Sequence, residues 1–221
     1  MSDRSLRRGE LNPSDPAVTI RSAVQQEPID VARPHLWLVR HGETEWARLG
    51  KHTGLTDVPL TDLGRNQAHA VAAKLVGHRF ARVLSSPLSR ALDTARLAGF
   101  AKRVESTSDL VEWDYGRDEG RTTVEIRADR PNWTIWGMGP AGGETIDQVA
   151  ARVDRVIAGV RAGTGDTLVF AHGHVLRILA ARWIGEPPIE GRLFALSTAT
   201  VSVLGWERDQ AVIERWNEAC R

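Results

Sequence analysis

The sequence contains a single cysteine, Cys220, and only three lysines among its 29 basic residues. One cysteine can form neither an intrachain disulfide nor a thiolate metal cluster, which favours a reducing, cytoplasmic setting. No apolar run approaches the roughly 18 residues that cross a bilayer. The apolar patch at residues 17–20 is also too short for the core of a signal peptide. We therefore expect no membrane partner.

A surplus of charge is also lacking, because 29 basic residues face 28 acidic ones. A net charge of +1 provides no overall field that would recruit nucleic acid, so any anion must be bound locally. The 221 residues, 42% of them hydrophobic, are enough for one globular domain with a proper core. The 26 arginines fit either codon bias or function, and composition does not decide between them.

Residues 1–34 differ from the rest of the chain. They hold four of the ten prolines and five residues of each charge sign. This composition predicts a largely disordered N-terminal extension. The alternative is that part of it packs on the domain or on a second subunit. Residues 35–221 are expected to form a single domain.

Strands and helices alternate after residue 34. Mainly apolar runs at 35–39 and 167–171 predict buried strands, and residues 81–85 predict a further strand. Apolar residues at helical spacing predict helices from Thr61 to a stop at Gly77, from Pro87 to Leu97, over 145–161, and from His174 to Trp183. Residues 104–143 are rich in loops, and their tryptophans Trp113, Trp133 and Trp136 are expected to pack in the core or a lid. Strands at 193–206 and 211–216 predict a closing hairpin. The fold class is α/β, a three-layer α/β/α sandwich with a mainly parallel central sheet and helices on both faces.

Two of the predicted strands end in a histidine followed by glycine. Arg40-His41-Gly42 follows the first strand, and His172-Gly173-His174 follows the strand at 167–171. Sites in open α/β sheets lie beyond the carboxyl ends of the strands, so these segments are expected to converge. A third strand leads into Ser85-Ser86-Pro87 and then Arg90, a helix start suited to phosphate. Taken singly, such histidines and arginines are more often structural.

Several motifs in a fixed order give a more specific indication. They are residues 38–46, Thr53-Gly54, residues 60–67, residues 85–91, residues 112–116, residues 143–145 and residues 172–174. In this order, over about residues 35–206, they resemble the histidine phosphatase superfamily, the phosphoglycerate mutase-like proteins. The resemblance implies that His41 takes the phosphoryl group as nucleophile, a role that a neutral imidazole can fill near neutral pH. It also implies that Arg40, Arg90 and His172 hold the phosphoryl oxygens and that Glu112 donates a proton to the leaving group. No cofactor and no metal are implied.

Phosphatases and mutases of this superfamily share those residues. True mutases resemble this chain but carry a long insertion with an arginine pair, whereas here only 26 residues, 117–142, fill that gap and contain no such pair. Ala47 also replaces the family's usual asparagine. The details look most like the branch of sedoheptulose-bisphosphatase and broad-specificity acid phosphatases. That likeness implies a pocket for a small phosphorylated metabolite, lined by His52, Thr53, Gly54, Tyr115, Gly173 and Arg177.

Two other functions stay open. The chain could be a phosphoglycerate mutase, or a noncatalytic phosphate-binding module, since some family members have lost the nucleophile, whereas this chain keeps every catalytic position. A metal role for the paired histidines is disfavoured, since His41-Gly42-Glu43 lacks zinc-ligand spacing and a third ligand. A homodimer is possible, with the strand at 201–206 pairing across a two-fold axis.

Overall fold

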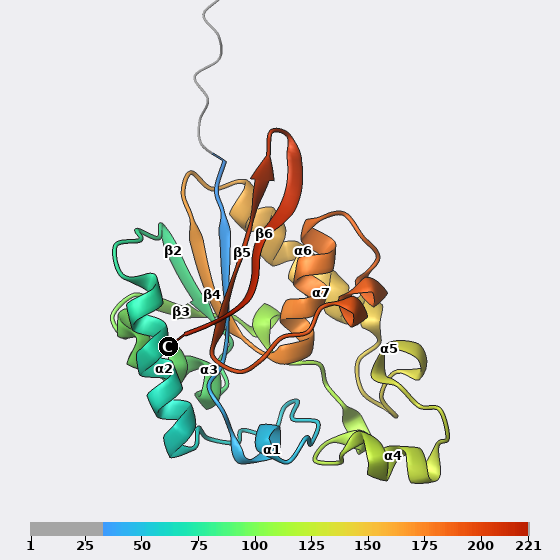
Figure 1. Cartoon of the computed structure of the whole chain (residues 1–221). Helices are drawn as coiled ribbons and strands as arrows, with labels where there is room; N and C mark the ends of the chain where they lie inside the picture. The colour runs from blue at the N-terminus through green and yellow to red at the C-terminus, as the bar shows by residue number, and fades with distance from the viewer. Residues whose placement is uncertain (1–32, 221) are drawn as a thin grey trace, which may run out of the picture. The chain divides into compact units, whose positions relative to one another are not determined.

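A computed structural model of the chain describes residues 33–220, which contain one six-stranded sheet with the strand order β3-β2-β4-β1-β5-β6 (Figure 1). The strands are β1 (Leu36–Arg40), β2 (Arg82–Ser85), β3 (Val104–Ser106), β4 (Thr167–Ala171), β5 (Thr200–Glu207) and β6 (Gln210–Ala219). Strands β1, β2, β3 and β4 run parallel to one another, whereas β5 and β6 are antiparallel to their neighbours. The mainly parallel sheet that the sequence predicts is confirmed.

Side chains of the central strands alternate between two separate hydrophobic cores. On β1, Leu36 and Leu38 enter one core while Trp37 and Val39 enter the other. The first core is closed by α6 (Ile146–Arg161) and α7 (Gly173–Trp183), and the second by α2 (Asp62–Leu75) and α3 (Ser89–Ala95). Figure 1 shows these two helix pairs on opposite sides of the sheet. The predicted three layers are therefore confirmed, and they explain why β1 and β4 are apolar on both faces.

Several helix starts follow from local hydrogen bonding, whereas α3 and α7 lack a side-chain cap, and the start of α7 matters for the site. Thr61 caps α2 by accepting from Gly64 N, and Thr145 with Gln148 forms a capping box at α6. His172 precedes α7 but its side chain makes no capping bond. The first amides of α7 are consequently available to another acceptor.

The loop-rich middle of the chain contains more regular structure than the sequence indicates. It includes β3, α4 (Thr123–Asp129) and α5 (Ile135–Met138), and the short α1 (Glu45–Arg48) also escapes prediction. Strand β3 has only three residues at a sheet edge, and Glu105 and Ser106 are exposed, so no apolar pattern marks it. Trp113 and Trp133 are buried, as expected for core packing.

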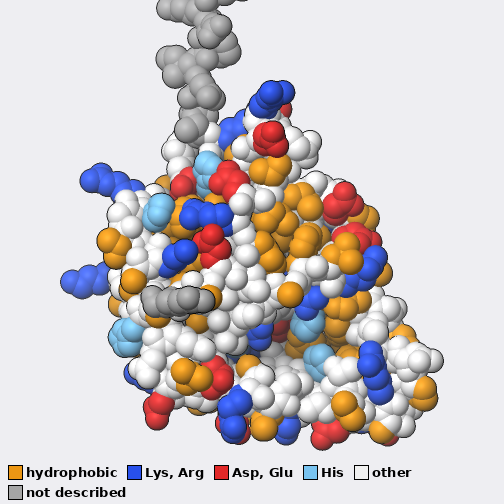
Figure 2. Space-filling view, in the orientation of Figure 1, with side chains coloured by type: hydrophobic (Ala, Val, Ile, Leu, Met, Phe, Trp, Pro, Cys, Tyr) orange, Lys and Arg blue, Asp and Glu red, His pale blue; other side chains and the backbone are white. Residues whose placement is uncertain are grey.

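The closing hairpin begins later than predicted. Residues 188–193 form a 3₁₀ turn, and the strand starts only at Thr200. Strand β5 is hydrogen-bonded to β1 on one side and to β6 on the other, so residues 201–206 have no free strand edge for the pairing with a second chain that the sequence left open. Strand β6 instead forms the edge of the sheet on this side. On the hairpin, Trp206, Ile213 and Trp216 are partly buried, and hydrophobic side chains gather beside it in Figure 2.

The predicted extension at residues 1–34 lies outside the described residues, apart from Arg33 and Pro34. These two contact the hairpin, since Arg33 Nη2 lies 2.6 Å from Asp209 Oδ1 and Trp206 Nε1 donates to the Pro34 carbonyl. Within residues 33–220, no helix combines the length and the apolar character that a bilayer crossing requires.

Candidate active site

The predicted site residues gather at the carboxyl end of the parallel strands, at the lower end of the sheet in Figure 1. Strand β4 lies between β1 and β2, with Arg40 in register with Ala171 and Ser85 with Phe170. His41 N continues the ladder by donating to the Ala171 carbonyl over 3.0 Å. Adjacent parallel strands thus bring the two histidine segments together.

His41 is buried and held in one tautomer. Its Nδ1 lies 2.7 Å from the carbonyl of Gly42, which only accepts, so Nδ1 carries the proton and Nε2 bears the free lone pair. Burial, together with the positive charges of Arg90 and Arg40, holds the pKa of His41 well below its ordinary value of 6.5. The ring is therefore neutral, and Nε2 is nucleophilic, at neutral and mildly acidic pH.

The loop after His41 requires glycine. A Cβ on Gly42 would lie 2.3 Å from the Gly64 carbonyl oxygen, and a Cβ on Gly64 would lie 2.1 Å from that of Glu43. No side chain fits where the β1 loop and the start of α2 approach so closely. Gly42 N also donates to Thr94 Oγ1, which ties the loop to α3. These contacts fix the backbone that presents His41.

His172 lies beside His41, with ring centroids 5.1 Å apart. Arg90 Nε donates to His172 Nδ1 over 3.1 Å, which leaves the proton of the neutral ring on Nε2. Burial, with the charge of Arg90, keeps the pKa of His172 well below 6.5. Its buried Nε2 has no hydrogen-bond partner among the described residues. An unpartnered buried donor is costly unless a ligand completes it.

Arg90 is fully buried and bonded mainly to protein. Besides His172, it donates to three carbonyls of one loop, at Thr53, Gly54 and Thr56. Glu119 accepts from the amides of Gly54 and Thr56 on the same loop. Four of the five guanidinium N–H groups are thereby used, and one on Nη1 is left without a partner within residues 33–220. Arg90 therefore shapes the loop that carries Thr53 as well as offering a donor.

Arg40 keeps a free donor as well. Its Nη1 donates to the Leu196 carbonyl, whereas its buried Nε has no partner in the described part of the chain. Burial lowers the pKa of Arg40, and the charge of Glu112 opposes this effect. Arg40 Nε and His172 Nε2 are thus two unsatisfied donors beside the His41 segment.

Glu112 accepts the free amides at the start of α7. Its Oε1 accepts from Trp113 N and Val175 N, and its Oε2 accepts from His174 N, all within 3.0 Å. Helix α7 thus places positive partial charges against this carboxyl group. Oε2 keeps one lone-pair position that no described protein donor fills, and this position can carry a proton.

These groups surround a cavity of about 110 Å³. Its lining comprises Arg40, His41, Ala47, Lys51, His52, Thr53, Glu112, Tyr115, Gly173, His174, Arg177 and Leu196. Eight predicted site residues are in this wall, while Gly54, Arg90 and His172 lie behind it. Lys51 and His174 are lining residues that the sequence analysis did not select. The His172-Gly173-His174 motif pointed to His174, whereas nothing in the local pattern distinguished Lys51.

The far wall of the cavity is aromatic and cationic. Tyr115 Oη lies 2.6 Å from His174 Nδ1, and the His52 ring centroid is 4.9 Å from that of Tyr115. Burial raises the pKa of Tyr115 well above 10 and lowers that of His174 well below 6.5, so both are neutral. The Arg177 guanidinium stands 4.7 Å from the Trp136 ring centroid and donates to the carbonyls of Gly191 and Arg192. Arg40, Lys51 and Arg177 outnumber the one acidic lining residue, Glu112, which favours anionic ligands.

Within residues 33–220, no group of three or more His, Cys, Asp or Glu side chains is arranged to hold a metal ion. The cavity wall instead presents cations, which repel a metal ion.

Comparison with known proteins places these features in a family. A family model described as the histidine phosphatase superfamily (branch 1) matches residues 36–219. An acid phosphatase from Mycobacterium tuberculosis is 43% identical over 182 residues, covering 80% of this chain and 89% of that protein. Sedoheptulose 1,7-bisphosphatase from Saccharomyces cerevisiae is 36% identical over 185 residues, covering 69% and 68%.

The solved structure of an open reading frame product from Mycobacterium tuberculosis has a TM-score of 0.79 and 39% identity. The match covers 85% of this chain and 99% of the other. A probable phosphoglycerate mutase from Proteus mirabilis is also similar, at 28% identity over 191 residues, 82% of this chain and 89% of that protein.

Proposed function

This chain belongs to the histidine phosphatase superfamily, and on that basis we propose that it is a phosphomonoesterase acting on small phosphorylated metabolites through a phosphohistidine at His41. Relatives named acid phosphatase and sugar bisphosphatase support a phosphatase activity. The strongest support for this proposal is the free Nε2 lone pair of neutral His41, which lies beside two buried donors, Arg40 Nε and His172 Nε2, that lack partners within residues 33–220. A phosphoryl group supplies acceptor oxygens to both donors and an electrophile to the lone pair.

The proposed reaction has two steps and needs no cofactor. In the first, His41 Nε2 attacks phosphorus, the ester P–O bond breaks, and Glu112 Oε2 gives its proton to the leaving oxygen. In the second, water attacks phosphorus, Glu112 takes a proton from that water, and the N–P bond breaks to return neutral His41. Arg40, Arg90 and His172 stabilise the charge on the phosphoryl oxygens, where most of the catalytic effect in phosphoryl transfer arises.

The proposed substrates carry a second anionic group. Lys51 and Arg177 add positive charge to the wall, and the Lys51 ammonium lies 5.7 Å from the Trp46 ring centroid. His52, Thr53, Gly54, Tyr115 and Gly173 would contact the body of the substrate or shape its pocket. Sugar bisphosphates and phosphorylated acids have this chemistry. The single cysteine favours a cytoplasmic enzyme, and both this location and a homodimer stay predictions.

Phosphoglycerate mutase is the alternative, since a mutase relative is also similar. In a mutase, a substrate hydroxyl replaces water in the second step. The short segment 117–142, without an arginine pair, favours water. A noncatalytic phosphate-binding module is a weaker alternative, because His41 and Glu112 are both present.

One assay distinguishes the phosphatase, the mutase and the binding module. The enzyme is incubated with sugar mono- and bisphosphates and with phosphoglycerates, and phosphate release is measured beside phosphoglycerate isomerisation. We expect phosphate release that is lost in His41→Ala. Isomerisation much faster than phosphate release would establish the mutase. The absence of both reactions would establish the binding module.

A further inference from the structure

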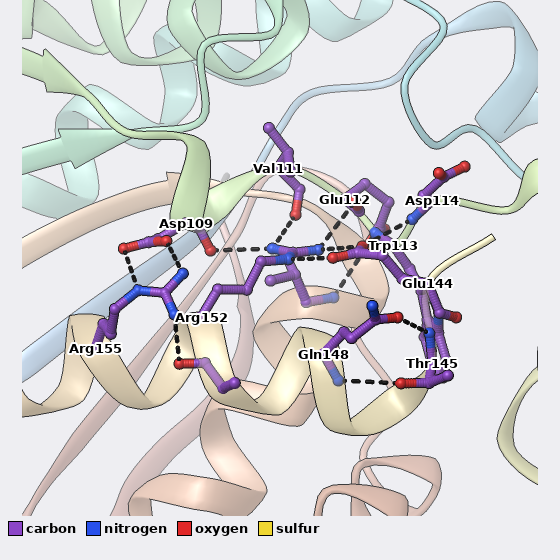
Figure 3. Close-up of polar contacts among 12 residues, drawn as sticks. Asp109, Val111, Glu112, Trp113, Asp114, Glu144, Thr145, Gln148, Arg152 and Arg155 are labelled. Carbon is purple, nitrogen blue, oxygen red and sulfur yellow. Dashed lines mark hydrogen bonds and ion pairs between the residues drawn. The ribbon is translucent and has the colours of Figure 1, made fainter.

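The segment that carries Glu112 lies against helix α6, where Arg152 meets it (Figure 3). Arg152 is only 6% exposed, and all five of its guanidinium N–H groups are bonded. Two reach the Glu144 carboxylate at 2.9 Å each, and three reach the backbone carbonyls of Asp109, Val111 and Glu112 at 2.7 to 3.1 Å. Arg152 thus fixes the chain immediately before and at Glu112.

Glu144 fixes the chain immediately after Glu112. Its Oε2 accepts from Asp114 N over 3.1 Å, its carbonyl accepts from Trp113 Nε1 over 2.8 Å, and its own amide donates to the Asp114 carbonyl. A Cβ on neighbouring Gly143 would lie 2.0 Å from the Asp114 carbonyl oxygen, so only glycine permits this approach. The Gly143-Glu144 motif is explained by these contacts and not by contact with the cavity, which neither residue lines.

We infer that Arg152 and Glu144 form a positioning pair that sets Glu112 for proton transfer, an inference that rests on the proposed function. Neither residue lines the cavity, so they act through the backbone of residues 109–114. Glu112 accepts hydrogen bonds from two amides of α7, so its place depends on the backbone that carries it. A displacement of about 1 Å between catalytic groups can cost a hundredfold in rate. A buried ion pair is by itself weak evidence for stability, whereas this one bonds the backbone on both sides of the acid.

The test compares two leaving groups. A nitrophenolate leaves as a stable anion without a proton, whereas an alkoxide requires one from Glu112. Arg152→Lys keeps the charge but cannot make five directed bonds. We expect kcat/KM for an alkyl ester such as glycerol phosphate to fall at least tenfold further than kcat/KM for p-nitrophenyl phosphate. Glu112→Gln is expected to show the same selectivity, because removing a general acid typically costs 10²- to 10⁴-fold.

Arg155 offers a matched control on the same helix. It pairs with the Asp109 side chain, is 62% exposed and does not touch Glu112, so Arg155→Lys is expected to change both rates less than twofold. Glu144→Gln removes the ion pair but keeps an acceptor for Asp114 N. If Arg152→Lys does not fold, this second variant tests the positioning role in its place. Equal losses on both esters, in the variant that folds, would overturn the positioning role alone. Hydrolysis of neither ester by the wild-type enzyme would instead refute the proposed phosphatase function.

Discussion

Arg90 Nε donates a 3.1 Å hydrogen bond to His172 Nδ1, and this bond makes His172 Nε2 a donor. The same guanidinium bonds three carbonyls of the loop 53–56. One arginine therefore sets a histidine tautomer and the shape of a substrate loop together. Such a residue is sensitive to replacement even by another cation.

Arg90→Lys is expected to lower kcat/KM by about 100- to 1,000-fold, the usual cost of losing a transition-state donor. An ammonium group cannot bond His172 and the loop in the planar geometry that the guanidinium provides. Steady-state kinetics with any accepted phosphomonoester measures the effect. Arg96→Lys is the control, because Arg96 is exposed and, within residues 33–220, pairs with Asp93 alone. Activity within about threefold of wild type in Arg90→Lys would contradict this role.

Gly173→Ala is expected to separate activity from stability. A Cβ at this position would lie 3.4 Å from Arg40 Cζ and 3.6 Å from Glu112 Oε2, so it fits but narrows the space between two catalytic groups. We expect kcat/KM to fall at least tenfold, while the free energy of unfolding is unchanged or rises by up to about 1 kcal/mol, since alanine favours helix.

Gly159→Ala in α6 is the matched control for that experiment. It has the same helix-forming effect, and its Cβ would approach only Arg82, at 3.6 Å. It is expected to stabilise the protein without lowering activity, as measured by urea unfolding and kinetics. An unchanged kcat/KM in Gly173→Ala would show that the phosphoryl group does not occupy that space.

Lys51→Met tests the second anionic group. Hydrogen bonds to charged groups contribute about 1.5–3 kcal/mol, so kcat/KM for a bisphosphate is expected to fall roughly tenfold or more. A monophosphate without a second charge is expected to change little. Lys74→Met is the control, since Lys74 pairs with Glu218 outside the cavity. Equal losses on both substrates would contradict the assignment of Lys51 to the distal group.

The buried histidines make stability depend on pH. His41, His172 and His174 have folded-state pKa values well below 6.5, so the unfolded chain binds more protons between those values and pH 6.5. The free energy of unfolding must then fall as pH drops below about 6.5, by up to about 1.4 kcal/mol per pH unit for each histidine. Urea unfolding at pH 7.5 and 5.5 measures this. A smaller decrease is expected in His174→Asn and the full decrease in His69→Gln, because His69 is exposed. Equal stability at both pH values would contradict the neutral buried rings.

Much of the site follows from where strands end. The runs before His41 and His172 are apolar on both faces, so they predict adjacent buried strands, and parallel neighbours bring their carboxyl ends together. The bonds of Arg90 to residues 53–56 depend on a loop conformation that no periodicity encodes. Lys51, which lines the cavity, comes just before that loop. Strand β3 is too short and too exposed to leave a pattern.

The position of Arg152 in the sequence marks it as a buried charge. It follows Val149 by three residues and precedes Val156 by four, which places it on the buried stripe of α6. A charged residue on such a stripe requires partners. Those partners come from residues 109–112 and from Glu144, and only the folded chain shows them.

Trapping the phosphorylated enzyme tests the central claim most directly. The enzyme is mixed with a phosphomonoester labelled in the phosphoryl group, denatured in alkaline detergent, and examined for bound label and its position by phosphorus NMR. Because Nδ1 of His41 is bonded to the Gly42 carbonyl, we predict label on Nε2, stable in base, lost in acid and absent in His41→Ala. Turnover without bound label, or label that persists in His41→Ala, would contradict a phosphohistidine at His41.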